Sequence, residues 1–161
     1  MKILHLMRHA KSSWKQPELA DRERGLNKRG KRDAPRMGVA LATQLQAPVI
    51  DVSPAQRAQL TLAGLCDGWP ELAGRQHRTH EALYTFSSGE VFTWIASQDE
   101  DRDSLFLIGH NPALTELVNE LAGRWCLDNL PTAGYARLSL AIDQWSQLHN
   151  SCGELEMALF P

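Results

Sequence analysis

Short apolar runs alternate with segments whose apolar residues recur at helical spacing along this chain of 161 residues. The first run, residues 2–7, is almost continuous, as expected for a strand covered on both faces of a sheet. Runs at residues 47–52 and 104–108 predict two more strands of this kind. Residues 135–142 and 155–160 predict the last two strands, as an antiparallel hairpin at the sheet edge. This alternation predicts an α/β fold with three α/β/α layers and a mostly parallel sheet.

The first helix is predicted over residues 34–45, where apolar side chains recur at every third or fourth position. Pro35 lies inside this pattern, and proline is tolerated best in the first turn of a helix. The helix therefore begins either with Asp33 as its cap or further back, at Asn27, with a bend at the proline. Polar residues dominate the preceding segment, residues 11–32, which we expect to form a long surface loop.

Two further helices are predicted from a polar cap residue followed at once by proline, a common helix start. Ser53-Pro54 opens a helix that is expected to end near Cys66. Asn111-Pro112 opens another, which is expected to end at Gly123. The segments between them are predicted to be, in order, rich in turns, a short polar strand, a helix and a charged loop: residues 67–74, 75–83, 89–97 and 99–103.

Composition adds limits on size and partners. Area scaling for a chain of 18.0 kDa predicts roughly 8,000 Å² exposed when folded and roughly 26,000 Å² when unfolded, enough burial for one core. We therefore expect a single domain covering residues 1–161. The net charge of −2 disfavours nucleic-acid binding through a large basic field. No apolar run approaches the ~20 residues that span a bilayer, so no membrane partner is expected either.

The cysteines and histidines give little support for a metal or a disulfide framework. Cys66, Cys126 and Cys152 are odd in number, far apart and never in C-x-x-C spacing, which favours a reducing, cytoplasmic setting. The apolar stretch at the start of the sequence is too short for a signal peptide. His77 and His80 are three positions apart, but no third ligand lies near them. We expect neither a metal nor another cofactor.

Residues with phosphate chemistry follow three of the predicted parallel strands. The first strand runs into Arg8-His9, the second into Ser53 and then Arg57, and the third into His110. Ligands of open parallel sheets bind at the carboxyl ends of strands, so these side chains are expected to converge. Guanidinium groups and helix N-termini bind phosphate oxygens, and histidine supplies a nucleophile or proton carrier. The set predicts a site for a phosphoryl group.

Four motifs, in order over nearly the whole chain, resemble those of the histidine phosphatase superfamily, which includes the phosphoglycerate mutases. They are Leu6-Met7-Arg8-His9, Arg24-Gly25-Leu26-Asn27, Ser53-Pro54-x-x-Arg57-Ala58-x-x-Thr61 and Leu107-Ile108-Gly109-His110-Asn111-Pro112. The small size of the chain and its segment 21–27 resemble the short bacterial branch, the SixA-like phosphohistidine phosphatases.

The sequence also departs from the family pattern. Ala10 replaces the glycine that usually follows the histidine of the Arg-His-Gly signature, and Leu60 replaces a common glutamine. Residues 11–14 differ from the mutase pattern, and no long insertion is present to cover a sugar-phosphate pocket. These differences disfavour a mutase.

The resemblance implies roles for several side chains. His9 is expected to be the nucleophile, and Arg8, Arg57 and His110 are expected to bind the transferring phosphoryl group. Arg24 stands where the branch has an arginine before a leucine, which makes it a candidate for a phosphate or substrate contact.

Many members of the family have an acidic proton donor after the third strand, and Glu81 is the best-placed candidate for that role. Its alternative interpretation is an ordinary loop carboxylate.

Together, the sequence predicts a metal-independent phosphatase that forms a phosphohistidine enzyme intermediate. The expected substrate is phosphohistidine on a protein. Two alternatives stay open: a phosphatase of small phosphoesters such as sugar or nucleotide phosphates, and a catalytically silent phospho-binding module.

Overall fold

A computed structural model describes residues 1–161 and contains one six-stranded sheet with the strand order β3-β2-β4-β1-β5-β6. The strands β3, β2, β4 and β1 run parallel to one another, whereas β5 runs antiparallel to both of its neighbours, β1 and β6. The strands are β1 (Lys2–Arg8), β2 (Ile50–Val52), β3 (Arg78–Thr79), β4 (Ser104–Gly109), β5 (Tyr135–Leu140) and β6 (Gly153–Leu159). The mostly parallel sheet and its antiparallel edge hairpin are thus confirmed.

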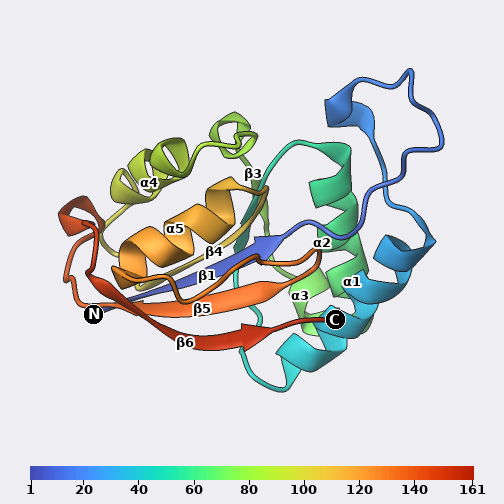
Figure 1. Cartoon of the computed structure of the whole chain (residues 1–161). Helices are drawn as coiled ribbons and strands as arrows, with labels where there is room; N and C mark the ends of the chain where they lie inside the picture. Colours follow the sequence, from blue (N-terminus) through green and yellow to red (C-terminus); the bar gives the residue numbers. More distant parts are fainter.

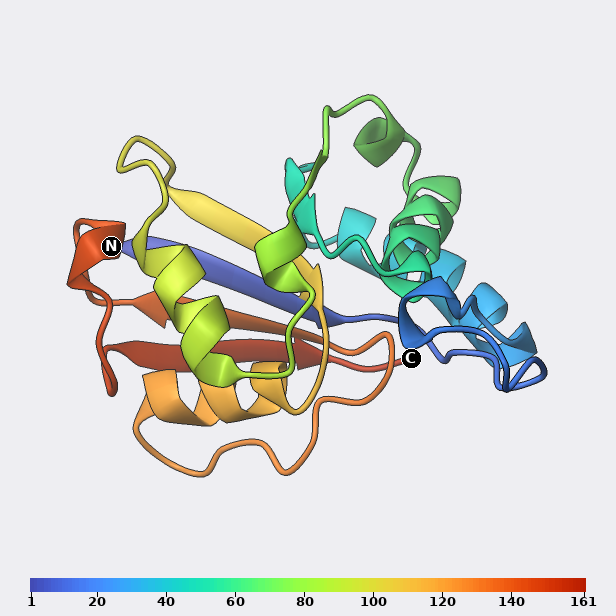
Figure 2. The same ribbon diagram turned by 90° about the horizontal axis from the view of Figure 1, so that it is seen from above.

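Helices cover both faces of this sheet, as Figure 1 shows. They are α1 (Lys28–Ala42), α2 (Gln56–Gly68), α3 (Pro70–Ala73), α4 (Ser88–Ala96) and α5 (Ala113–Ala122). Three short 3-10 turns complete the chain: η1 (Asp21–Glu23), η2 (Glu81–Leu83) and η3 (Trp145–Gln147). In Figure 2, α1 and α2 lie together on one side of the molecule, apart from α4 and α5. None of these helices is both long and apolar enough to cross a lipid bilayer.

The alternation of side chains along β1 divides the core into two clusters. Leu4 and Leu6 pack into the cluster beneath α4 and α5, while Met7 packs into the one beneath α1 and α2. His5 points to the second side as well, where its ring stacks on Phe106 at a centroid distance of 5.5 Å. Both faces of the central strand are therefore buried, which confirms the three α/β/α layers. The folded chain exposes 7780 Å², close to the area expected from its mass.

The register of the two central strands, β1 and β4, places His9 and His110 side by side. Arg8 pairs with Gly109 in the parallel β1–β4 ladder, and the His9 N–H donates to the Gly109 carbonyl at 3.1 Å. His9 and His110 thus leave the same edge of the sheet from adjacent strands. The Ser53 N–H donates to the Ile108 carbonyl at 3.0 Å, so β2 delivers its own loop to the same edge.

Helix α1 begins at the earlier of the two predicted positions, after Asn27 and not after Asp33. Asn27 is the N-cap, and its side chain accepts a hydrogen bond of 2.9 Å from the Gly30 N–H. Pro35 lies inside the helix. The expectation of a surface loop over residues 11–32 was therefore wrong for its last residues, because a capped helix start does not need an apolar pattern.

The two predicted proline-marked helix starts were placed too early. Helix α2 begins at Gln56 after Ala55, and Ser53 does not cap it. Helix α5 begins at Ala113, although Asn111 still accepts a hydrogen bond of 3.1 Å from the Thr115 N–H. In both loops the polar residue lies before the helix proper.

The remaining elements differ from expectation chiefly in length. The strand expected over residues 47–52 is only β2, and the polar strand expected over residues 75–83 shrinks to β3 followed by η2. The turn-rich segment at residues 67–74 contains α3, while the predicted helix near residues 89–97 is α4. All three cysteines are unpaired.

Candidate functional site

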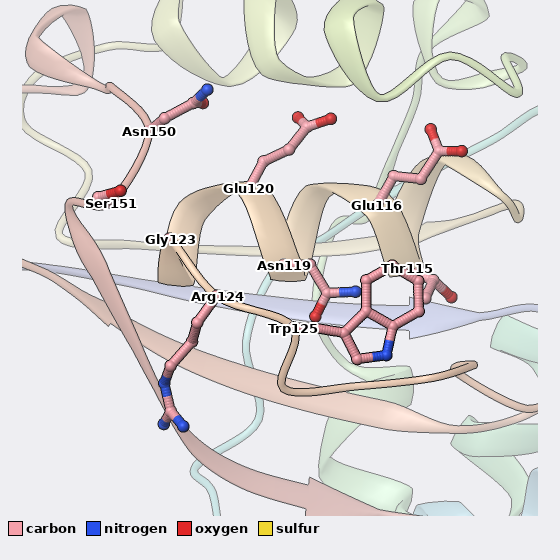
Figure 3. A pocket seen from close by; sticks show the side chains of 9 residues that line it. All are labelled: Thr115, Glu116, Asn119, Glu120, Gly123, Arg124, Trp125, Asn150 and Ser151. Atoms are coloured by element: carbon pink, nitrogen blue, oxygen red, sulfur yellow. The ribbon is translucent and has the colours of Figure 1, made fainter.

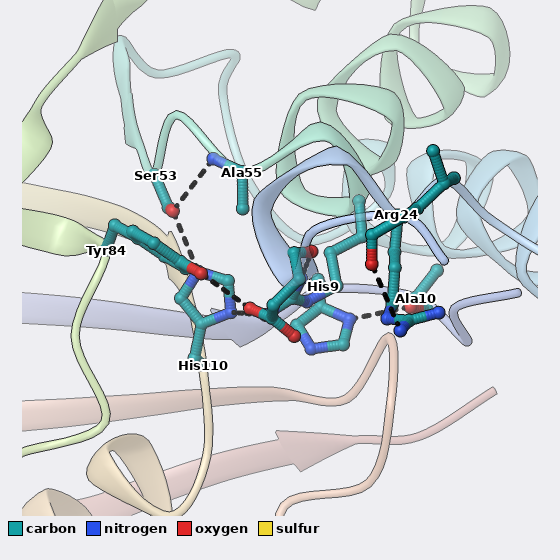
Figure 4. Close-up of polar contacts among 10 residues, drawn as sticks. His9, Ala10, Arg24, Ser53, Ala55, Tyr84 and His110 are labelled. Atoms are coloured by element: carbon teal, nitrogen blue, oxygen red, sulfur yellow. Dashed lines mark hydrogen bonds and ion pairs between the residues drawn. The ribbon is translucent and has the colours of Figure 1, made fainter. Parts of the chain in front are cut away.

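The residues expected to bind a phosphoryl group meet at the carboxyl ends of β1, β2 and β4. Figure 4 shows His9 and His110 close together, with Ser53 and Tyr84 around them. The two imidazole rings have their centroids 5.3 Å apart and are tilted by 50°. Arg57, in the first turn of α2, directs one terminal nitrogen toward Nδ1 of His110 at 3.4 Å. The structure therefore brings together side chains that are up to about a hundred positions apart in the sequence.

The ring of His9 is held in one orientation by its own loop. Its Nδ1 lies 2.7 Å from the carbonyl oxygen of Ala10, which can only accept a hydrogen bond. Nδ1 therefore carries the proton, and Nε2 keeps a free lone pair. Burial lowers the pKa of His9 to about 4, with smaller contributions from the nearby charges of Arg57 and Arg8. The ring is thus neutral at pH 7 and available as a nucleophile.

Thr61 ties this loop to α2. The Ala10 N–H donates a hydrogen bond of 2.8 Å to the Thr61 hydroxyl, which itself donates to the Arg57 carbonyl at 2.7 Å. Ala10 and Thr61 are both fully buried. The position after His9 therefore has room for a small residue, which agrees with the exchange of the usual glycine for alanine.

The ring of His110 is oriented by Ser53, the residue that was expected to cap a helix. Nδ1 faces the N–H of Arg57, so Nε2 carries the proton and donates to the Ser53 hydroxyl at 2.7 Å. Ser53 also accepts a bond of 3.2 Å from the Ala55 N–H. Burial, followed by the charges of His9 and Arg57, lowers the pKa of His110 to about 3. The hydroxyl of Ser53 thus fixes the tautomer of a neutral imidazole.

Arg57 is bound on both terminal nitrogens by one residue, Asp21 of η1. Nη1 donates to the Asp21 backbone oxygen at 2.7 Å, and Nη2 donates to its carboxylate at 3.0 Å. The Tyr84 hydroxyl donates to the same carboxylate oxygen at 2.6 Å. Burial opposes ionisation of Asp21, but the hydrogen bonds from Tyr84 and Arg57 outweigh it and lower the pKa of this carboxyl group. The Asp21 carboxylate thus binds the Arg57 guanidinium group, which was expected to bind phosphate.

Arg8 supplies a second cation near Arg57. Its Nη1 donates to the Leu130 carbonyl at 3.2 Å, and its buried Nε has no hydrogen-bond partner. Burial lowers the pKa of Arg8, and so does the like charge of Arg57. Two guanidinium groups held against their mutual repulsion create a positive potential that favours an anion.

Arg24 is turned toward its own loop. Its guanidinium donates to the Leu19 carbonyl at 3.3 Å and to the Gln16 and Pro17 carbonyls at 3.5 Å. The group also lies over the ring of Trp14, 3.8 Å from its centroid. Its side chain is almost completely buried. These contacts hold the loop that carries Asp21, and none of them reaches His9 or Arg57; the expected substrate contact of Arg24 stays a prediction.

Glu81 lies at the exposed start of η2, where its carboxylate is bound by the Arg22 guanidinium. This hydrogen bond is the main cause of the lowered pKa of Glu81. Arg22 also lies over the Tyr84 ring, 5.3 Å from its centroid. Glu81 is thus near the rim of the site, paired with a cation and connected to His9 by no hydrogen bond.

Asp21 and Tyr84 belong to the site but were not among the residues expected there, and the contact of Ser53 with His110 was not predicted. Asp21 and Tyr84 lie in segments without an apolar pattern, and nothing in their spacing pointed to Arg57. Ser53 follows the second strand and belongs to a family motif, but the only role predicted for it is that of a helix cap.

No three or more histidine, cysteine, aspartate or glutamate side chains gather in a way that could hold a metal ion. His77 and His80 are used within the fold. His77 Nδ1 accepts a hydrogen bond of 3.0 Å from the Ile50 N–H, and His80 Nε2 lies 2.7 Å from the Asp51 carboxylate.

A cavity of about 490 Å³ lies elsewhere, along α5 and the turn at residues 150–151. Figure 3 shows Glu116, Glu120 and the indole of Trp125 around it. Glu120 accepts a hydrogen bond of 2.9 Å from the Ser88 hydroxyl. Two carboxylates at this opening disfavour a phosphorylated ligand, so size alone does not mark the site of phosphate chemistry.

Comparisons with known proteins agree with this geometry. The protein named Uncharacterized protein Rv1276c of Mycobacterium tuberculosis is 32% identical to this chain over 162 residues, which are 92% of this chain and 96% of that protein. The structure is similar to a SixA protein of Agrobacterium tumefaciens, assigned as a phosphohistidine phosphatase, with a TM-score of 0.81, 25% identity and coverage of 99% and 98%. It also shares the fold of the mycobacterial glucosyl-3-phosphoglycerate phosphatase Rv2419c, with a TM-score of 0.71, 15% identity and 98% coverage of both chains.

Residues 4–102, more than half of the chain, match the sequence pattern described as "Histidine phosphatase superfamily (branch 1)". The chain belongs to the histidine phosphatase superfamily and is a hydrolase that acts as a phosphatase.

Proposed function

We propose that this phosphatase transfers the phosphoryl group of its substrate to His9 and then hydrolyses the phosphohistidine. The observation that carries this proposal is the hydrogen bond from His9 Nδ1 to the Ala10 carbonyl at 2.7 Å. It leaves Nε2 unprotonated in a ring that is neutral at pH 7. A covalent intermediate divides one difficult displacement into two easier ones.

The phosphoryl group is held by Arg8, Arg57 and His110 around this nucleophile. In phosphoryl transfer, catalysis comes mainly from in-line positioning and from stabilising the charge on the equatorial oxygens. Two guanidinium groups and the N–H groups in the first turn of α2 offer that stabilisation without a metal. When a dianionic phosphoryl group lies beside His110, it favours the protonated imidazole, which then donates a hydrogen bond to phosphate.

The substrate that we infer is a phosphohistidine on a protein. The imidazole of phosphohistidine can be protonated at neutral pH before it leaves, whereas an alkoxide needs a proton from the enzyme. The similarity to the SixA protein of Agrobacterium tumefaciens, at 25% identity, supports this substrate class.

A small phosphoester is the second candidate substrate. It is favoured by the Asp21 carboxyl group, which contacts the Arg57 guanidinium and is 48% exposed at the mouth of the site. Such a group can assist an oxygen leaving group, which a phosphohistidine substrate does not require.

A trapping experiment tests the mechanism. Enzyme mixed with a phosphohistidine protein or with phenyl phosphate, each carrying labelled phosphate, is quenched rapidly in base. We expect a base-stable, acid-labile phosphoprotein, with the label on the peptide that contains His9. The His9→Ala variant should fold, because the side chain lies at a strand end, but should show neither label nor turnover.

Label on Ser12, Ser13 or His110, or substantial turnover by His9→Ala, would contradict the proposed intermediate. Tight phosphate binding without turnover by the wild type would instead indicate a phospho-binding module. The ratio of kcat/KM between the two substrates then separates the phosphoprotein from the small-ester proposal.

A further inference from the structure

The carboxylate of Asp21 lies where an anion is expected to bind. Both terminal nitrogens of Arg57 donate to Asp21, and the Tyr84 hydroxyl donates to the same carboxylate oxygen. A phosphoryl group that uses Arg57 must therefore replace the carboxylate or share the guanidinium with it. Resting on the function proposed above, we propose that Asp21 is the acid–base catalyst that protonates the leaving oxygen of a phosphoester.

The charges around Asp21 explain how an ionised carboxylate becomes an acid. In the free enzyme it faces Arg57 from α2, Tyr84 from the loop after η2, and the neutral rings of His9 and His110. A phosphoryl dianion that binds Arg57 removes the Nη2 N–H group from the carboxylate and adds a negative charge beside it. Both changes favour the protonated form of Asp21 and oppose the effect of the positive charge that His110 gains beside the same dianion. The substrate thus creates the acid that its own leaving group needs.

The reaction then balances in two steps. In the first, the lone pair of His9 Nε2 forms the N–P bond while the bond from phosphorus to the leaving oxygen breaks. The carboxyl proton of Asp21 passes to that oxygen, which leaves as an alcohol. In the second, water attacks phosphorus, the N–P bond breaks with its electrons returning to Nε2, and Asp21 takes a proton from the water. Release of inorganic phosphate lets Asp21 lose its proton and bind Arg57 again.

Asp21 is better placed for this task than Glu81. The Glu81 carboxylate is bound by Arg22 at the rim of the site, and it contacts neither a histidine nor Arg57. The Asp21 carboxylate is in direct contact with the Arg57 guanidinium at 3.0 Å, and its side chain is 48% exposed, so a leaving group on the solvent side can reach it. The Tyr84 hydroxyl donates to the carboxylate at 2.6 Å and holds it in place.

Leaving-group dependence tests the proposal. The Asp21→Asn variant should lose about 10²-fold or more of kcat/KM on an alkyl phosphate, whose alkoxide needs a proton. The same variant should stay within a few-fold of wild type on 2,4-dinitrophenyl phosphate and on a phosphohistidine protein, whose leaving groups need little help. Glu81→Gln is the matched control and should affect the three substrates equally and slightly.

Two further readouts separate proton transfer from a structural role. The kcat of the wild type on an alkyl phosphate should fall at high pH as the acid is lost, and this fall should be absent in Asp21→Asn. Inorganic phosphate should bind Asp21→Asn more tightly, because no carboxylate competes for Arg57. Tyr84→Phe keeps Asp21 but removes a hydrogen bond that lowers the pKa of its carboxyl group, so the fall of kcat on the alkyl phosphate should move to higher pH. This variant decides the question if Asp21→Asn does not fold, and an unchanged pH profile would contradict Asp21 as the acid.

An equal loss on all three substrates, or no loss on any, would overturn the assignment of Asp21. So would a selective loss on the alkyl phosphate in Glu81→Gln. These outcomes are distinct from failure of the proposed function, because base-stable label on His9 from 2,4-dinitrophenyl phosphate still forms when only the acid has been assigned wrongly.

Discussion

The hydroxyl of Thr61 joins Ala10, which follows the nucleophile, to the helix that carries Arg57. It accepts a hydrogen bond of 2.8 Å from the Ala10 N–H and donates one of 2.7 Å to the Arg57 carbonyl. The two bonds fix the distance between the His9 loop and the arginine that we expect to bind phosphate. Small displacements of reacting groups reduce phosphoryl transfer strongly, because the step depends on alignment.

Replacing Thr61 by valine keeps the shape of the side chain and removes both hydrogen bonds. The buried Ala10 N–H then has no partner, which costs about 1–3 kcal/mol of unfolding free energy. We expect kcat to fall while KM changes little. Urea unfolding and steady-state kinetics measure the two effects. Thr43→Val is the control, since the exposed Thr43 hydroxyl also donates to a helix carbonyl; a loss of the same size there would contradict a specific role for Thr61.

A second prediction concerns the shape of the Arg57 side chain. Arg57→Lys keeps the positive charge but cannot present two parallel N–H groups to one anion. We expect kcat/KM to fall by about 10²-fold, the usual effect of removing one donor that stabilises the transition state. Arg36→Lys, on the exposed side of α1, should be neutral. Near-normal turnover by Arg57→Lys would remove Arg57 from the phosphoryl site.

The sequence predicts the parts of this site that follow from strand ends. His9 and His110 come directly after apolar runs, and adjacent parallel strands end at the same edge of the sheet. Their convergence therefore follows once the two strands are predicted. The companion residues are different in kind. Asp21 reaches Arg57 from a polar segment 36 positions earlier, and no periodicity connects them. Only the folded chain brings these two residues together.

Ser53 shows why a correct local signal can give the wrong partner. A serine before proline has a strong tendency to cap a helix. In the fold, its hydroxyl is fully buried beside the imidazole of His110 and bonds that ring at 2.7 Å, while the helix starts later, at Gln56. A buried imidazole N–H needs an acceptor, and this tertiary demand outweighs the local one. The early start predicted for α2 and the missed contact with His110 therefore have the same cause.

A third prediction concerns metal ions. Arg8 and Arg57 supply the positive charge around the expected phosphoryl group, a task that Mg²⁺ or Zn²⁺ performs in metal-dependent phosphatases. Exhaustive dialysis against EDTA should therefore leave kcat/KM unchanged on aryl phosphate. A loss that added Mg²⁺ or Zn²⁺ restores would contradict the proposed binding of phosphate by guanidinium groups alone.

A fourth prediction concerns the contact between α1 and α2. A Cβ atom at Gly38 would lie 2.3 Å from the Leu65 carbonyl oxygen, so the two helix backbones approach each other at a position that only glycine allows. Gly38→Ala should destabilise the chain by about 1–3 kcal/mol through overpacking, although alanine is the better helix former. Gly74→Ala is the control, because its Cβ would meet only ordinary contact at 3.5 Å. Equal unfolding free energies for the two variants would contradict the close approach.

The last prediction links burial of His5 to stability in acid. The ring of His5 is hydrogen-bonded through Nδ1 to the Tyr135 hydroxyl at 2.7 Å and stacked on Phe106. Burial, followed by the charge of Arg137, lowers the pKa of His5 from 6.5 to about 4. Between these two values the unfolded chain binds the proton and the folded chain does not. The free energy of unfolding must therefore fall as the pH drops from 6.5 to 4.

His5→Gln removes this titration and keeps an amide that can bond the Tyr135 hydroxyl. A shift of this size corresponds to about 3 kcal/mol between neutral pH and pH 4. The variant should therefore lose less stability than the wild type over that range, although it starts from a lower stability at pH 7 because glutamine stacks less well on Phe106. Urea unfolding at a series of pH values measures both slopes. Parallel curves for wild type and variant would contradict burial of the His5 imidazole as the cause, because His5 would then contribute no titration. An equal flattening in the exposed variant His149→Gln would contradict it as well, because the titration would then belong to a histidine at the surface.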